Sequence, residues 1–107
     1  SLSVTSQLDR KFHVLAVVGN LTSGPDLSVL QRAARSALES GTADGLILDL
    51  SGTQNADSAG LGELTVIYSL CVRNGCTLIL KGVSEQLRRM LASTHLDALL
   101  FSDPYTN

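Results

Sequence analysis

The sequence contains few residues that break or cross-link a chain, with only two prolines and two cysteines. Pro25 and Pro104 lie at the start of an expected helix and in the tail, so no proline-rich linker divides the chain. Cys71 and Cys76 have no second pair of ligands at zinc-binding spacing, and they do not form a disulfide framework. We expect both cysteines to be small buried hydrophobic residues.

An excess of positive charge and long apolar runs are also absent. Eight Lys and Arg residues stand against ten Asp and Glu residues, and no basic stripe suits nucleic-acid phosphates, so we expect no nucleic-acid partner. No apolar run approaches the roughly 18 residues of a membrane span, and residues 1–12 lack the apolar stretch of a signal peptide. We therefore expect a cytoplasmic protein without membrane insertion, in which residues 1–107 form one domain.

Apolar periodicity predicts the element order β-β-α-β-α-β-α. The expected strands are residues 3–8, 12–18, 44–50 and 76–82, and the expected helices lie within 23–41, 58–73 and 83–94. Strands that alternate with helices indicate an α/β fold with parallel crossovers, and the tight turn after the first strand makes that strand antiparallel. We predict a mixed sheet of four or five strands with three to four helices. The expected core includes Val17, Leu48, Leu50, Leu64, Ile79 and Leu91.

Helix boundaries and buried faces can also be predicted. Ser23 and Asp26 fit an S-x-x-D capping pattern with Pro25 in the first turn, and Gly41 should end that helix. Asn74 and Gly75 should end the second helix. The predicted buried faces are Leu27, Leu30, Ala34, Ala37 and Leu38 on the first helix, Leu61, Leu64, Tyr68, Cys71 and Val72 on the second, and Leu87, Met90 and Leu91 on the third. A short apolar piece, residues 95–101, precedes the polar tail.

The segment "SGTQNADSAG" follows a strand of the predicted sheet, where function tends to gather in α/β proteins. Ser58 or Asp57 can cap the following helix by accepting a hydrogen bond from its free N–H groups. Ser58 also suits phosphorylation, because those N–H groups and the positive end of the helix dipole stabilise an anion. Either role is compatible with the other.

Enzyme chemistry at Ser58 is not expected. A G-x-S-x-G elbow would need glycine where Ala56 stands, and a nucleophilic serine needs a histidine base. His13 lies inside a strand and His95 follows the third helix. A nucleotide-hydrolase loop is absent too, because "LKGVSE" has its lysine before a single glycine. We expect no catalytic residues, no metal and no cofactor.

The stretch "LILDLSGTQNADSAGLGEL" resembles the signature of STAS domains, the fold of bacterial anti-sigma factor antagonists. The resemblance extends from about residue 4 to 101, through "VVGNLTSGPDL", "VRNGCTLILKGVS" and "VSEQLRRMLASTHLDALLF". It implies a switch protein whose partner is an anti-sigma factor, itself a serine kinase of the GHKL type. Unphosphorylated antagonist would bind that kinase and release a sigma factor, and Ser58 matches the serine that the kinase phosphorylates.

The resemblance also implies a docking surface, made of two loops and the start of a helix. The expected partner-binding residues are Asp57, Ser58, Ala59, Gly60, Leu61, Asn20 and Thr22. Family members often read "GELD" where this chain has "GNLT", so neutral Asn20 and Thr22 replace two acids. The alternative function is a STAS subunit of a larger assembly, such as a stressosome component or a cytoplasmic subunit of a lipid-transport ABC system. At most a weak homodimer is expected.

Overall fold

One mixed sheet, with strand order β1-β2-β3-β4, organises the computed structural model, which describes residues 2–41 and 44–95. The elements are β1 (Ser3–Asp9), β2 (Phe12–Val18), α1 (Ser28–Glu39), β3 (Gly45–Gly52), α2 (Ser58–Arg73), β4 (Thr77–Lys81) and α3 (Glu85–Ser93). β1 pairs antiparallel with β2, and β2, β3 and β4 are parallel. The predicted α/β class, element order and strand directions are confirmed.

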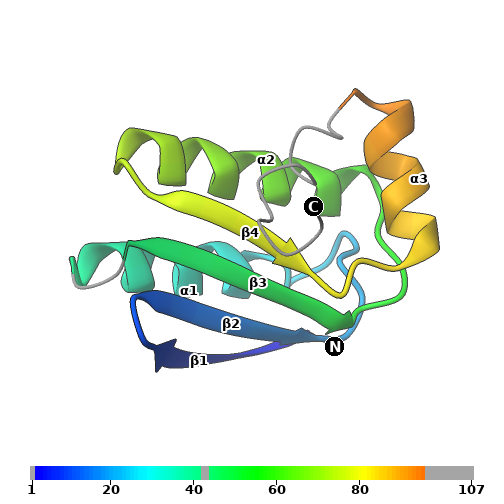
Figure 1. The fold of residues 1–107 in the computed structure, drawn as a ribbon. Coiled ribbons are helices and arrows are strands. Elements are labelled where there is room, and N and C mark those ends of the chain that lie inside the picture. Colours follow the sequence, from blue (N-terminus) through cyan, green and yellow to red (C-terminus); the bar gives the residue numbers. More distant parts are fainter. Residues whose placement is uncertain (1, 42–43, 96–107) are drawn as a thin grey trace.

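Helices α1 and α2 lie next to each other against the sheet, and α3 stands beside the carboxyl end of β4 (Figure 1). Strand residues alternate between the two faces of a sheet, so every second residue of β2 and β3 points toward the helices. The core cluster forms there and contains five of the six predicted core residues: Val17, Leu48, Leu50, Leu64 and Leu91. The sixth, Ile79, is buried too, but it pairs with Ile47 and lies outside this cluster, on the other face of the sheet. Among the described helices, none is long and apolar enough to cross a membrane.

The predicted buried stripe of α2 is partly wrong. Tyr68 is 39% exposed and Val72 is 60% exposed, whereas Ile67 and Leu70 are buried. The helix contacts α1 and also β4, so its buried arc continues from Leu64 through Ile67 instead of following the i+4 steps to Tyr68 and Val72. The predicted end at Asn74 and Gly75 is confirmed, since Asn74 is the C-cap and Gly75 has φ +68°.

The predicted start of the first helix is wrong. Helix α1 begins at Ser28, and its N-cap, Leu27, makes no side-chain capping hydrogen bond. Residues 24–27 form a turn instead, in which the Leu27 N–H donates to the Gly24 carbonyl at 3.3 Å. Gly41, with φ +66°, follows the end of α1 as predicted.

The remaining expectations have mixed outcomes. Cys71 is buried as predicted, but Cys76 is only half-buried because it precedes β4 at the end of a turn. Met90 is likewise half-buried, between the buried Leu87 and Leu91 of α3. The expected apolar piece at 95–101 lies, apart from His95, outside the described residues.

Candidate functional site

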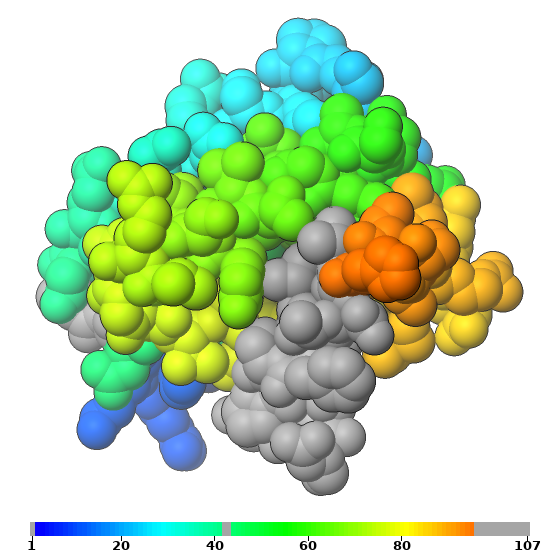
Figure 2. Space-filling view, turned by 90° about the horizontal axis from the view of Figure 1, so that it is seen from above, coloured from blue at the N-terminus to red at the C-terminus, as the bar shows by residue number. Residues whose placement is uncertain are grey.

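The loops that follow β2, β3 and β4 meet at the carboxyl end of the sheet. The Gly19 N–H donates to the Gly52 carbonyl at 3.1 Å, and the Leu21 N–H donates to the Asn55 carbonyl at 3.0 Å. From the third loop, the Ser84 hydroxyl donates to the Gln54 carbonyl at 3.0 Å. Figure 2 shows the first loop, in blue to cyan, beside the start of α2, in green. The three loops therefore form one continuous surface.

Asp57 connects two of these loops through its side chain. Its Oδ1 accepts from the Gly60 N–H at 3.0 Å and so caps α2, while its Oδ2 accepts from the Ser23 N–H at 2.8 Å. We call this pair of contacts the Asp57 clasp. Its backbone adds a further link, because the Asp57 N–H donates to the Leu21 carbonyl at 3.1 Å. The loop before α1 is thus held by a residue that belongs to the start of α2.

The clasp lowers the pKa of the Asp57 carboxyl below its ordinary value. The hydrogen bond from the Ser23 N–H is the largest cause, followed by that from Gly60. Both donors favour the charged form of the carboxylate. Asp57 is therefore anionic at neutral pH, directly beside Ser58.

Ser58 is the first residue of α2, and its side chain is exposed. Of the two capping residues considered from the sequence, Asp57 makes the cap, and within the described residues no hydrogen bond engages the Ser58 hydroxyl. A free hydroxyl at the first turn of a helix is accessible to a modifying enzyme. The N–H groups of that turn lie beside it and can stabilise an added anion.

Two further predicted site residues lie inside the protein. Gly60 and Leu61 are buried, and Ala59 is half-buried. A Cβ atom built on Gly60 would overlap the carbonyl oxygen of Leu21, so only glycine lets the two loops approach this closely. These residues shape the surface from beneath, whereas Ser58 presents a side chain on it.

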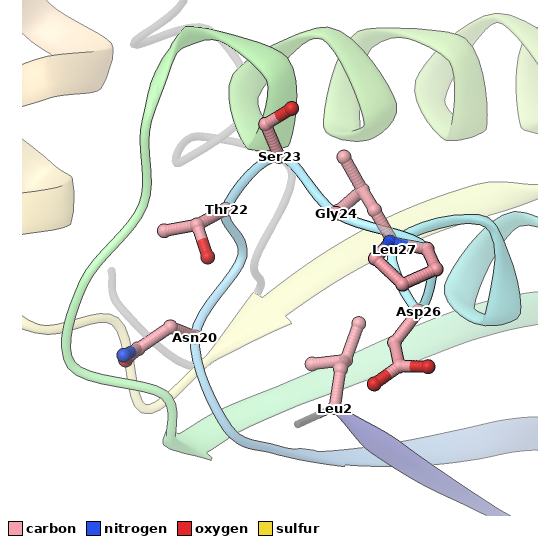
Figure 3. A pocket seen from close by; sticks show the side chains of 8 residues that line it. Leu2, Asn20, Thr22, Ser23, Gly24, Asp26 and Leu27 are labelled. Atoms are coloured by element: carbon pink, nitrogen blue, oxygen red, sulfur yellow. The ribbon is translucent and has the colours of Figure 1, made fainter.

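Asn20 and Thr22 are both exposed on the first loop, and Figure 3 shows that their side chains project from the same side of it. They also line a shallow pocket of about 220 Å³, which ends at Asp26 and Leu27. The resemblance had indicated the loop "GNLTSGPD", residues 19–26, as part of this surface, but it did not indicate Leu2. Leu2 enters it from the start of β1, which no local pattern could indicate.

The histidines do not form a catalytic group with Ser58. His13 lies near the start of β2, at the opposite end of the parallel strands, where its Nε2 is 2.9 Å from the Ser40 hydroxyl. No hydrogen bond joins His13 or His95 to Ser58 in the described part of the chain. Clusters of three or more potential metal-binding side chains are also absent from residues 2–41 and 44–95.

The strand order, the three helices and the capped loop at residues 51–58 together define a STAS domain. The chain belongs to the family described as "Mlab, STAS domain", whose model matches residues 4–101. This match confirms the resemblance stated from the sequence and its extent.

Solved structures of other proteins share this fold. The unphosphorylated anti-sigma factor antagonist SpoIIAA is 16% identical, with a TM-score of 0.76 over 92% of this chain and 85% of that one. An anti-sigma factor antagonist from Mycobacterium paratuberculosis is 23% identical, with a TM-score of 0.72 over 94% of this chain and 83% of that one. A sulfate transporter family protein from Wolinella succinogenes is 22% identical, with a TM-score of 0.70 over 87% of this chain and 75% of that one.

Proposed function

We propose that this protein is an anti-sigma factor antagonist, a non-catalytic switch that binds an anti-sigma factor serine kinase of the GHKL type and so releases a sigma factor. The observation that carries the proposal is the exposed, unengaged hydroxyl of Ser58 beside the Asp57 clasp. The similarity in fold to two anti-sigma factor antagonists supports it. In the part of the chain that the structure describes, no histidine is hydrogen-bonded to Ser58, which supports a role as phosphate acceptor over one as nucleophile.

Phosphorylation of Ser58 changes the surface more than the fold. The phosphate adds roughly −1.5 to −2 charges at neutral pH, next to the anionic Asp57. Helix N–H groups stabilise this anion by roughly 0.3–1 kcal/mol, so α2 keeps its start. A docking partner, in contrast, must desolvate a bulky dianion beside a like charge, which costs several kcal/mol at an interface.

The first loop forms the second part of the proposed docking surface. Asn20 and Thr22 are exposed there, and the Asp57 clasp fixes their loop against the start of α2. Both side chains are neutral, so they offer the partner hydrogen-bonding groups at positions where relatives often carry a carboxylate. A kinase that recognises this protein must therefore tolerate or prefer neutral residues in the first loop.

Calorimetry with the candidate kinase tests the proposal. Wild type and Ser58→Ala should bind, whereas Ser58→Asp and phosphorylated protein should bind orders of magnitude more weakly at an unchanged melting temperature. Ser69→Asp is the matched control, since Ser69 is exposed on the same helix about three turns further along. Incubation with ATP and the kinase should add one phosphate to wild type and none to Ser58→Ala, as mass spectrometry would record.

Equal affinities for wild type, Ser58→Asp and phosphorylated protein would contradict the switch and favour the second candidate, a STAS subunit of a larger assembly. The similarity to a sulfate transporter family protein is the specific observation that favours this alternative. In that case the clasped loops would form a permanent contact, and Ser58 would serve only as the first residue of a helix.

A further inference from the structure

The two edges of the described sheet differ in how they are protected. At one edge, the three central residues of β4 are buried and the strand ends in a lysine. At the other edge, β1 has seven residues, of which all but Val4 are exposed. A strand with free N–H and C=O groups along one side is a template for pairing with another strand.

Strand β1 also lacks the features that normally prevent such pairing. Residues 3–8, "SVTSQL", contain no proline, glycine or charged residue, and β1 pairs with β2 without a bulge from Ser3 to Asp9. Natural edge strands commonly carry lysine, proline or a bulge that blocks addition of another strand. Leu8, which is 52% exposed, adds apolar surface at this edge.

The hydrogen-bond pattern shows which residues of β1 face outward. The Lys11 carbonyl, at the turn before β2, accepts from the Asp44 N–H, so odd-numbered residues of β2 direct their backbone groups toward β3. Even-numbered residues of β2 therefore bond to β1, and their partners there are Ser3, Thr5, Gln7 and Asp9. Within residues 2–41 and 44–95, the backbone groups of Val4, Ser6 and Leu8 have no strand partner and point away from the sheet.

We propose that β1 pairs antiparallel with β1 of a second copy of this chain, about a two-fold axis at Ser6. This arrangement sets Val4 opposite Leu8 of the second copy and joins the free backbone groups of both strands. A two-fold axis uses the same patch on both subunits, and for antiparallel strands it keeps the helices of both copies on one side. The result is one continuous sheet built from two copies.

Charge favours this pairing over the parallel one. Asp9 is the single charged residue of β1, and the turn that follows carries Arg10 and Lys11. Antiparallel pairing places the two Asp9 side chains and the two turns at opposite ends of the interface. Parallel pairing in register would place Asp9, Arg10 and Lys11 each beside the same residue of the second copy. Such neighbouring like charges destabilise a strand pair.

The inferred dimer does not depend on the proposed kinase switch. β1 lies at the sheet edge away from α2, so the start of α2 stays exposed in the pair (Figure 1). Pairing along one strand of seven residues covers less surface than the roughly 1,200–2,000 Å² of a stable interface. The association should therefore be weak and dependent on concentration.

Sedimentation velocity over a range of concentrations up to millimolar tests the pairing. Thr5 and Gln7 are exposed and would lie opposite each other across the axis, in a pair without backbone hydrogen bonds where side chains come close. Wild type should form dimers at high concentration. The double variants Thr5→Lys/Gln7→Lys and Thr5→Glu/Gln7→Glu should each stay monomeric at unchanged melting temperature, and their equimolar mixture should form dimers again.

The control is Gln86→Lys/Ala92→Lys, which adds the same charge at exposed positions of α3 and should dimerise like wild type. Hydrogen exchange gives a second measurement, because the amides of Val4, Ser6 and Leu8 should become protected as concentration rises. The pairing is wrong if wild type stays monomeric throughout, if either double variant dimerises like wild type, if the mixture stays monomeric, or if the control loses the dimer.

Discussion

Helices α1 and α2 follow parallel strands of the same sheet, yet they begin in different ways. Asp57 caps α2 with its side chain, whereas the N-cap of α1, Leu27, makes no side-chain hydrogen bond. The loop before α1 is instead held by a residue of another loop, because the Ser23 N–H donates a hydrogen bond to Asp57. One carboxylate thus serves the starts of both helices.

This asymmetry bears on how the two halves of the site are coupled. The first loop, with Asn20 and Thr22, has its position set by a side chain next to Ser58. Any change at the start of α2 therefore acts close to the contact that holds the other loop. The start of α1 has no comparable influence, because among the described residues the backbone hydrogen bonds of its turn join residues 24–30 to one another.

The largest effect on stability is expected from Gly60→Ala, which breaks the approach of the two loops. The added methyl group would overlap the Leu21 carbonyl oxygen and lie 2.8 Å from its carbonyl carbon, so backbone must move. We expect a loss of roughly 2 to 3 kcal/mol, in the upper part of the roughly 1–3 kcal/mol typical of overpacking because the clash is with backbone, measured by denaturant unfolding.

Gly62→Ala in the same helix is the matched control. A Cβ at Gly62 meets no atom within 4 Å, and alanine is the better helix former, so this variant should gain about 0.5–1 kcal/mol. Equal unfolding free energies for Gly60→Ala and Gly62→Ala would show that there is room for a side chain between Gly60 and Leu21.

Acid should weaken the clasp with a definite sign. The folded-state pKa of Asp57 lies below the ordinary 3.8, so between these values the unfolded chain binds more protons than the folded one. The stability that Asp57 contributes is complete above about pH 3.8 and is lost as the pH falls through the folded-state pKa. Asp57→Asn should lower the melting temperature by a few degrees at neutral pH, and the difference should disappear in strong acid.

Asp26→Asn controls for the change in net charge, since no side-chain hydrogen bond of Asp26 occurs within the described residues. It should melt like wild type at neutral pH. A melting difference between Asp57→Asn and wild type that persisted unchanged into strong acid would mean that the carboxylate charge does not hold the two loops.

The start of helix α3 is capped by a serine. The free-energy cost of replacing this serine gives a reference value for the starts of α1 and α2. The Ser84 hydroxyl oxygen accepts from the Leu87 N–H at 3.1 Å and donates to the Gln54 carbonyl at 3.0 Å. Ser84→Ala should cost about 1 kcal/mol by thermal unfolding. Ser93→Ala at the other end of α3 should change stability by less than about 0.5 kcal/mol, and a reversed order of the two would contradict the capping role.

The sequence predicted what depends on local periodicity and failed where distant contacts compete. The short apolar run "GLILDL" predicted a strand buried on both faces and so placed Leu48 and Leu50 in the core, and Asp57 could be recognised as a cap because it immediately precedes the helix. The buried face of α2 was mistaken at Tyr68 because the position of β4 beside the helix decides it. Spacing along the chain cannot reveal such packing.

Ser23 is the clearest case of such competition. Its S-x-x-D pattern predicts a cap for its own helix, but a carboxylate 34 residues away takes its N–H group. The pattern identified residues able to cap a helix, and the approach of a second loop decided their use. The Asp57 clasp could not have been predicted from either loop alone.

The smallest effect, and the sharpest test of the comparison, is expected from Ser23→Ala. If Ser23 capped α1 with its side chain, the substitution would cost about 1 kcal/mol, as for Ser84. In the structure Ser23 contributes its backbone N–H, which alanine keeps, and its side chain is exposed. The unfolding free energy should therefore stay within about 0.5 kcal/mol of wild type. In the Asp57→Ala background, Ser23→Ala should again have no effect, because the N–H donor is unchanged in both. A loss near that of Ser84→Ala would instead assign the start of α1 to the Ser23 hydroxyl and remove the asymmetry between the two helices.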